Sequence, residues 1–317
     1  VIVCHDEGTA SKLCDDLNAL SSGAYLYPAR DFSFRSADNK SHEFEQKRIG
    51  VLSRILDGEC RYVLCSAEAA MQLTLPGYEL TKRTLKLAVG DEKSTHEIVN
   101  TLISAGYVRT ELVEGIGQFS LRGGILDIFA PNDVQPCRIE FWGDTVDSIS
   151  YFDTQSQRRT ENLKEIRITP STEVLFDSLE VMKERLEDFI STVKGKGSVK
   201  AKQKINEDID SLEHYIHVGA PDKYLSLAYG ELHTIFDYMK DGLLFVCESA
   251  SVKQKFNTAS QLLMEDVRAM FEEGILTKGI DRYALTWSEF LSVYEKQKAI
   301  FVDNLARGSF DIPIKEL

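Results

Sequence analysis

The stretch GQFSLRGGILDIF, residues 117–129, decides how the middle of this chain folds. Its two apolar segments are separated by a glycine pair, which predicts a turn between two strands. Because strand side chains alternate between faces, Phe119 and Leu121 point inward and Arg122 points outward. Strand patterns of this kind are expected at residues 109–113, 118–122, 125–129, 137–142 and 148–153. We therefore expect a compact antiparallel β unit in this region.

Outside this unit, short apolar strands alternate with helical patterns. Strands are expected at residues 1–4, 61–65, 85–89, 242–247, 283–287 and 299–302. Helices are expected at residues 9–20, 41–57, 67–73, 94–105 and 179–193. Because parallel strands need crossover connections, this alternation predicts an α/β fold with a mostly parallel sheet. We expect one discontinuous α/β domain, residues 1–84 and 170–317, with a small antiparallel β-rich domain inserted at residues 85–169.

Composition limits the classes of function. The chain has 317 residues and a net charge of −13, which argues against nucleic-acid binding by the chain as a whole. Six cysteines, none in a C-x-x-C pair, predict reduced thiols in a cytoplasmic protein without a disulfide framework. No apolar run approaches the roughly 20 residues of a membrane span, and no signal peptide is evident. The start inside a strand at Val1 suggests that the natural protein has sequence upstream.

The first strand ends at an acidic pair, Asp6-Glu7, as in nucleotide hydrolases whose carboxylates hold Mg²⁺. That chemistry also needs a G-x-x-x-x-G-K-[ST] loop to cradle phosphates. The sequence contains no such motif, and Gly195-Lys196-Gly197-Ser198, the nearest match, lacks its spacing. We therefore interpret Asp6-Glu7 as a helix start favoured by the helix dipole. No catalytic residue, cofactor site or metal site is predicted.

Two other polar patterns receive structural interpretations. His214 and His217 have a spacing that metals can use, but no third ligand is indicated, so surface histidines are expected. A basic run at residues 194–204 contains no interleaved aromatic side chain, so base stacking is not indicated. We interpret this run as a solvated connection between helices, with weak nucleic-acid contact as the alternative.

The strand at residues 137–142 presents an unusual outer face. Its alternation directs Arg138, Glu140 and Trp142 away from the core, on the side to which Arg122 also points. An exposed tryptophan beside arginines is the composition of a protein-binding hot spot. The alternative is that Trp142 packs under a turn while the arginines pair with Glu140 or Asp144. The pattern alone leaves both interpretations open.

Long strings within residues 115–160 carry a family resemblance. The segment at residues 117–129, the string RIEFWGD at residues 138–144 and the string FDTQSQR at residues 152–158 resemble the module shared by UvrB and the bacterial transcription-repair coupling factor. The flanking segments fit the same family more loosely. Without helicase motifs after residue 170, the chain is closer to the N-terminal region of the coupling factor than to UvrB.

The resemblance implies a Rossmann- or RecA-like sheet with a degenerate nucleotide site and an inserted module that binds UvrA. The matching positions for UvrA contact are Arg122, Arg138 and Trp142, the last replacing the family's usual phenylalanine. It also implies that the whole protein is an ATP-dependent DNA translocase whose RNA polymerase and DNA contacts lie elsewhere, and that a C-terminal domain masks the docking surface. The alternative functions are a nucleotide-binding or nucleotide-hydrolysing α/β domain and a DNA-binding module centred on the lysine run.

Overall fold

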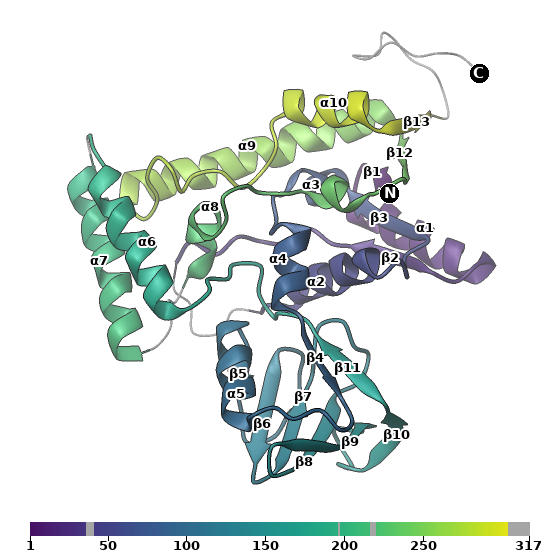
Figure 1. Ribbon diagram of the computed structural model, residues 1–317. Coiled ribbons are helices and arrows are strands. Elements are labelled where there is room, and N and C mark those ends of the chain that lie inside the picture. Colours follow the sequence, from purple (N-terminus) through teal and green to yellow (C-terminus); the bar gives the residue numbers. More distant parts are fainter. Residues whose placement is uncertain (36–40, 196, 216–219, 304–317) are drawn as a thin grey trace.

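The computed structural model describes residues 1–35, 41–195, 197–215 and 220–303. It is a mixed α/β protein with separate parallel and antiparallel sheets. An α/β body carries both ends of the described chain, and a β-rich unit projects from one side of it (Figure 1). The largest cluster of buried apolar side chains combines residues before 81 with residues after 173. A second cluster draws only on residues between 85 and 168.

The body is built on a five-stranded parallel sheet in the order β13-β12-β1-β3-β2. Its strands are β1 (Ile2–Cys4), β2 (Ala24–Tyr27), β3 (Tyr62–Ser66), β12 (Leu243–Cys247) and β13 (Lys298–Val302). Helix α1 (Glu7–Leu20) covers one face, where Ala10 and Cys14 pack against Cys4 and Leu64. The other face, including Val3, lies against α2 (Glu43–Leu56) in the main core.

Further helices of very different length complete the body. They are α3 (Ala67–Met71), α4 (Gly77–Arg83), α6 (Leu179–Thr192), α7 (Ser198–Tyr215), α8 (Leu225–Ala228), α9 (Ser249–Glu273) and α10 (Trp287–Lys296), with 3₁₀ turns at Pro221–Tyr224 and Ile235–Tyr238. Helices α9 and α10 run alongside each other above the sheet, while α6 and α7 pair at the far end (Figure 1). None of the helices in the described ranges is long and apolar enough to cross a membrane.

The β-rich unit is a six-stranded sheet in the order β10-β9-β8-β7-β6-β5. Its strands are β5 (Val108–Arg109), β6 (Gln118–Arg122), β7 (Ile125–Ile128), β8 (Cys137–Trp142), β9 (Thr145–Phe152) and β10 (Arg159–Leu163). Neighbours pair antiparallel except β5 and β6, which are parallel. Helix α5 (Thr95–Ser104) buries Ile98 and Leu102 against one face. The opposite face carries the predicted site.

A two-stranded ribbon joins the β-rich unit to the body. Strands β4 (Leu85–Ala88) and β11 (Glu165–Ile168) pair antiparallel where the chain leaves the body and returns. Close contacts fix the two parts: a Cβ on Gly50 would lie 2.5 Å from the carbonyl oxygen of Pro131. Arg54 Nη2 of α2 donates to the carbonyl of Asn132 at 2.7 Å, and within the inserted part Asn132 Nδ2 donates to the carbonyl of Arg167 at 2.8 Å. The β-rich unit is therefore seated directly on α2.

A buried ionic cluster ties the two halves of the body together. Arg30 Nη1 lies 2.9 Å from Glu45 and 3.1 Å from Asp222, and Arg48 Nε donates to Glu173 at 2.7 Å. Burial opposes ionisation of Glu45, but attraction to Arg30 and a hydrogen bond with a nearby histidine hold the pKa of Glu45 well below its usual range. Glu173 and Asp222 follow the β-rich unit in sequence, whereas the arginines precede it. The cluster therefore closes the body across the insertion.

Most of the expected elements are confirmed, with three corrections. The strand expected at residues 283–287 is wrong, because Ala284 forms only an isolated bridge with Gln72 and Trp287 begins α10. The strand expected at 109–113 ends at Arg109. The lysine run is not only a connection, because its later members, Lys200, Lys202 and Lys204, lie on α7. Strands β2, β10 and β11 and helix α4 were not anticipated from the sequence.

Candidate protein-binding surface

Strand β8 separates a buried face from an exposed one, as its alternation predicts. Cys137, Ile139 and Phe141 are at most 8% exposed and pack into the core of the β-rich unit. Trp142, at the end of the strand, is 85% exposed. Its ring therefore does not pack under a turn, and it stands on the same face as Arg138. A large aromatic side chain with this exposure is unusual on a protein surface.

The tight β6–β7 connection that follows Arg122 depends on two glycines. Gly123 adopts a positive φ of 60°, which glycine reaches without strain. A Cβ on Gly124 would lie 2.7 Å from the carbonyl oxygen of Phe141, so the turn and β8 could not approach as closely with another residue. Arg122 is thereby placed at the end of β6, opposite Ile125 of β7.

Arg122 and Arg138 meet at one buried carboxylate, that of Asp127. Asp127 lies on β7, directly opposite Arg138 in register, and its side chain is 2% exposed. Arg138 Nε donates to Asp127 Oδ1 at 2.6 Å and Arg138 Nη2 donates to Oδ2 at 2.9 Å. Arg122 Nη2 donates to the same Oδ2 at 2.8 Å. The sheet thus brings together the two arginines named from the sequence, through an aspartate that was not named.

Arg138 is further held from the side of the β9–β10 turn. Its Nη1 donates to the carbonyl of Gln157 and its Nη2 to Gln157 Oε1, both at 3.1 Å. The guanidinium carbon lies 4.6 Å from the ring centre of Phe152, a cation–π distance. Hydrogen bonds to Asp127, stronger than the opposing effect of burial, raise the pKa of Arg138. Gln157 has a left-handed φ of 58°, which is uncommon for a residue with a side chain.

The remaining charges on this face pair among themselves. Glu140 forms an ion pair with Arg159 and accepts a hydrogen bond from Ser148 Oγ at 2.9 Å. The pairing of Arg122 and Arg138 with Glu140 or Asp144, one alternative from the sequence, is therefore not what the structure shows. Counting Arg122, Arg138 and Arg159 against Asp127 and Glu140 gives three positive and two negative charges. The surface formed by Arg122, Arg138 and Trp142, hereafter the docking patch, is locally positive on an acidic chain.

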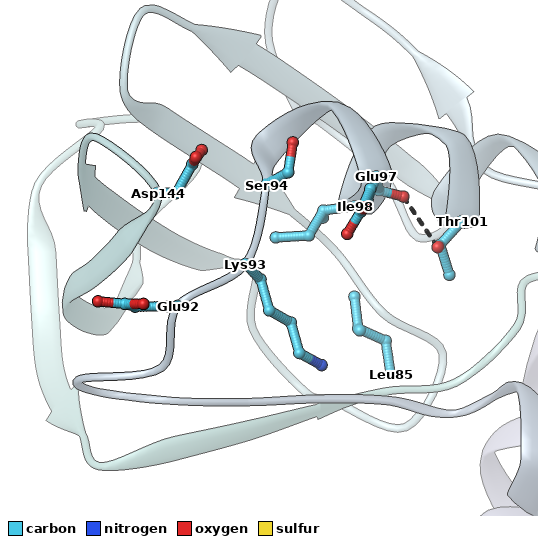
Figure 2. A pocket seen from close by; sticks show the side chains of 8 residues that line it. All are labelled: Leu85, Glu92, Lys93, Ser94, Glu97, Ile98, Thr101 and Asp144. Carbon is cyan, nitrogen blue, oxygen red and sulfur yellow. Dashed lines mark hydrogen bonds between the residues drawn. The ribbon is translucent and has the colours of Figure 1, made fainter.

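An acidic hollow of about 470 Å³ adjoins the turn that follows Trp142 (Figure 2). It lies between that turn, which contributes Asp144, and the start of α5, which contributes Glu97. Glu92 lines it and forms an isolated bridge with Thr145. Lys93 is the one cation among the lining residues. The hollow is therefore lined by three carboxylates, those of Glu92, Glu97 and Asp144, and one ammonium group.

The other polar patterns singled out in the sequence have structural roles or lie outside the described parts. Asp6 caps α1 by accepting a hydrogen bond from the Thr9 amide at 2.8 Å, and that bond lowers the pKa of Asp6. His217 and the side chain of His214 lie outside the described residues. Among the described residues no group of three His, Cys, Asp or Glu side chains is placed to hold a metal ion.

Comparison with known proteins gives consistent similarities. A family model described as the UvrB interaction domain matches residues 85–174. A transcription-repair-coupling factor of Bacillus subtilis is 28% identical over 260 residues, 79% of this chain and 22% of that protein. Those of Staphylococcus aureus (strain MRSA252) and Myxococcus xanthus are 27% and 31% identical over 73% and 62% of this chain, and 20% and 16% of their own lengths. The chain thus spans about a fifth of the curated relatives it matches.

Proposed function

The chain is similar over most of its length to bacterial transcription-repair coupling factors, and from this similarity we propose that it is their N-terminal UvrB-like region, acting as a non-catalytic docking module. Its setting is then transcription-coupled nucleotide excision repair. The UvrB interaction domain at residues 85–174 contains the whole β-rich unit and therefore the docking patch.

The partner of the docking patch in this proposal is UvrA, recruited to RNA polymerase stalled at a DNA lesion. The observation that carries the proposal is the 85% exposure of Trp142 on the same face as Arg122 and Arg138. Tryptophan and arginine dominate the binding energy of protein interfaces, because the ring buries a large area and the guanidinium donates several hydrogen bonds to carboxylates. Arg122, Arg138 and Trp142 are thus the proposed UvrA contacts.

The α/β body has the role of a scaffold in the same proposal. Its five-stranded parallel sheet is interpreted as a degenerate Rossmann- or RecA-like sheet, divided into residues 1–84 and 170–317 by the β-rich domain at residues 85–169. Asp6, which a nucleotide hydrolase would use for Mg²⁺, is engaged as the cap of α1. The translocase motor, the polymerase and DNA contacts, and a C-terminal domain that masks the docking patch would belong to other parts of a longer, cytoplasmic protein.

Calorimetric titration of this chain with purified cognate UvrA tests the proposal. We expect binding by the wild-type chain and strong loss in Trp142→Ala and Arg138→Ala variants whose folding is verified by circular dichroism. Leu262→Ala is a matched control, because Leu262 is an apolar side chain 59% exposed on α9 of the body. Binding that survives both docking-patch changes would move the interface elsewhere. No binding by folded wild-type chain would refute UvrA recruitment through this module.

A further inference from the structure

We propose that Asp127 is the positioning residue of the docking patch: its buried carboxylate holds Arg122 and Arg138 in the orientation in which the partner meets them. This inference rests on the proposed docking function and adds a residue that does not itself touch the partner. The carboxylate is 2% exposed, so a protein approaching the face would contact the arginines and not Asp127.

The position of Asp127 in the sheet explains why it can serve both arginines. Strand β7 lies between β6, which carries Arg122, and β8, which carries Arg138. The carboxylate accepts hydrogen bonds from both neighbours, at 2.6 and 2.9 Å from Arg138 and at 2.8 Å from Arg122. A buried carboxylate is stable only when it is paired and hydrogen-bonded. Arrangements in which both arginines turn away and leave the Asp127 carboxylate unpaired are therefore strongly disfavoured.

The two arginines differ in how completely they are held. Arg138 uses four of its five N–H groups, on Asp127 and Gln157, and its side chain is only 14% exposed. Arg122 makes one hydrogen bond to a described side chain, that of Asp127, and is 48% exposed. Arg138 is therefore the more rigidly held of the two arginines, and only a small part of its side chain remains available for contact. Arg122 presents the larger number of donors outward, and the partner group that suits them is a carboxylate.

Positioning matters for affinity because a long side chain loses rotamer freedom when a partner immobilises it. A guanidinium already held by a buried acceptor has lost much of that freedom before binding, which lowers the cost of association. Without the carboxylate, Arg122 and Arg138 would also repel each other across β7. Asp127 thus contributes to binding through the arginines, and its contribution should vanish when they are removed.

The decisive variant is Asp127→Asn, which keeps the shape of the side chain and removes its charge. We expect UvrA affinity to fall about tenfold or more in calorimetry, because two charge-assisted pairings are weakened. Asp241→Asn, at an exposed position in the loop before β12, changes the net charge equally and should leave affinity unchanged. In an Arg122→Ala background the same Asp127→Asn change should lower UvrA affinity clearly less, because the effects of substitutions at interacting residues are not additive.

An equal effect of Asp127→Asn in both backgrounds, or unchanged affinity in the single variant, would overturn the inference. If wild-type chain fails to bind UvrA, the docking function itself is refuted, which is a distinguishable result. Should Asp127→Asn fail to fold, a measurement on the wild-type chain still decides, because Asp127 accepts a hydrogen bond from Arg138 Nε but not from Arg122 Nε. In the wild-type chain, the Arg138 Nε–H should exchange with solvent much more slowly than that of Arg122 by NMR, and equal rates would contradict the proposal that Asp127 holds Arg138.

Discussion

The substitution Arg48→Ala should greatly lower the free energy of unfolding of the α/β body. The side chain is fully buried, donates to Glu173 at 2.7 Å and to Gln72 at 3.0 Å, and lies 4.3 Å from the ring centre of Tyr27. The cluster holds two arginines against three carboxylates, so Arg48→Ala leaves one arginine among three buried acids. Breaking a buried ion pair on one side costs about 3–5 kcal/mol.

Urea denaturation followed by circular dichroism measures this cost. With a slope of about 3 kcal/mol per molar urea, a loss of about 4 kcal/mol moves the midpoint of the body's transition down by about 1.3 M. Arg35→Ala is the control, because Arg35 pairs with Glu273 at the surface and is 58% exposed. An exposed ion pair of this kind contributes at most about 1 kcal/mol to the free energy of unfolding. A shift for Arg48→Ala no larger than that of the control would refute the role assigned to the cluster.

Three further predictions concern other parts of the chain. Burial, opposed by a hydrogen bond from Tyr151, raises the pKa of Asp133 to about 6. The charged form is therefore penalised in the folded protein, so Asp133→Asn should be more stable than wild type at pH 8, and the difference in melting temperature should disappear as the pH falls towards 4. Asp6→Ala removes the cap of α1 and should lower the free energy of unfolding by about 1 kcal/mol in urea titrations. Calorimetry with ATP and Mg²⁺ should give no saturable heat, and micromolar binding with turnover would instead support the nucleotide-hydrolase alternative.

The fold could be predicted where the local sequence pattern agrees with the burial of each side chain in the folded protein. Strand β8 was predicted at its observed bounds, Cys137–Trp142, because its inward residues are all apolar and its outward residues are not. The error at 283–287 arose where two signals competed. Tyr283 and Leu285 suggested a strand, whereas Thr286 and Glu289 form a capping box that starts α10. The capping box is a local signal in the sequence, and in the structure it prevails over the short apolar run.

The docking patch could be predicted only in part, because alternation gives the face of a residue but not its cross-strand neighbour. The alternation predicts that Arg138 points outward, and the acids near it in sequence, Glu140 and Asp144, are the partners that the pattern suggests. The observed acceptor, Asp127, lies opposite Arg138 only because of the register between β7 and β8. Gln157 contributes through a turn whose left-handed residue has no distinct sequence signature. Register and turn geometry are tertiary properties that one sequence pattern does not specify.

Buried carboxylates pair with guanidinium groups both in the α/β body and in the docking patch, but the exposure of the arginines differs between the two. In the body, Arg30 and Arg48 are both buried, so the cluster has no outward donor and serves rigidity. In the docking patch, Asp127 is buried but Arg122 is half-exposed, so part of the positive charge remains available at the surface. The chain has a net charge of −13, and salt screens charges beyond about 8 Å, so the attraction exerted by these arginines is short-ranged. In the proposed docking function, the arginines act at contact distance, where their fixed orientation matters more than their number.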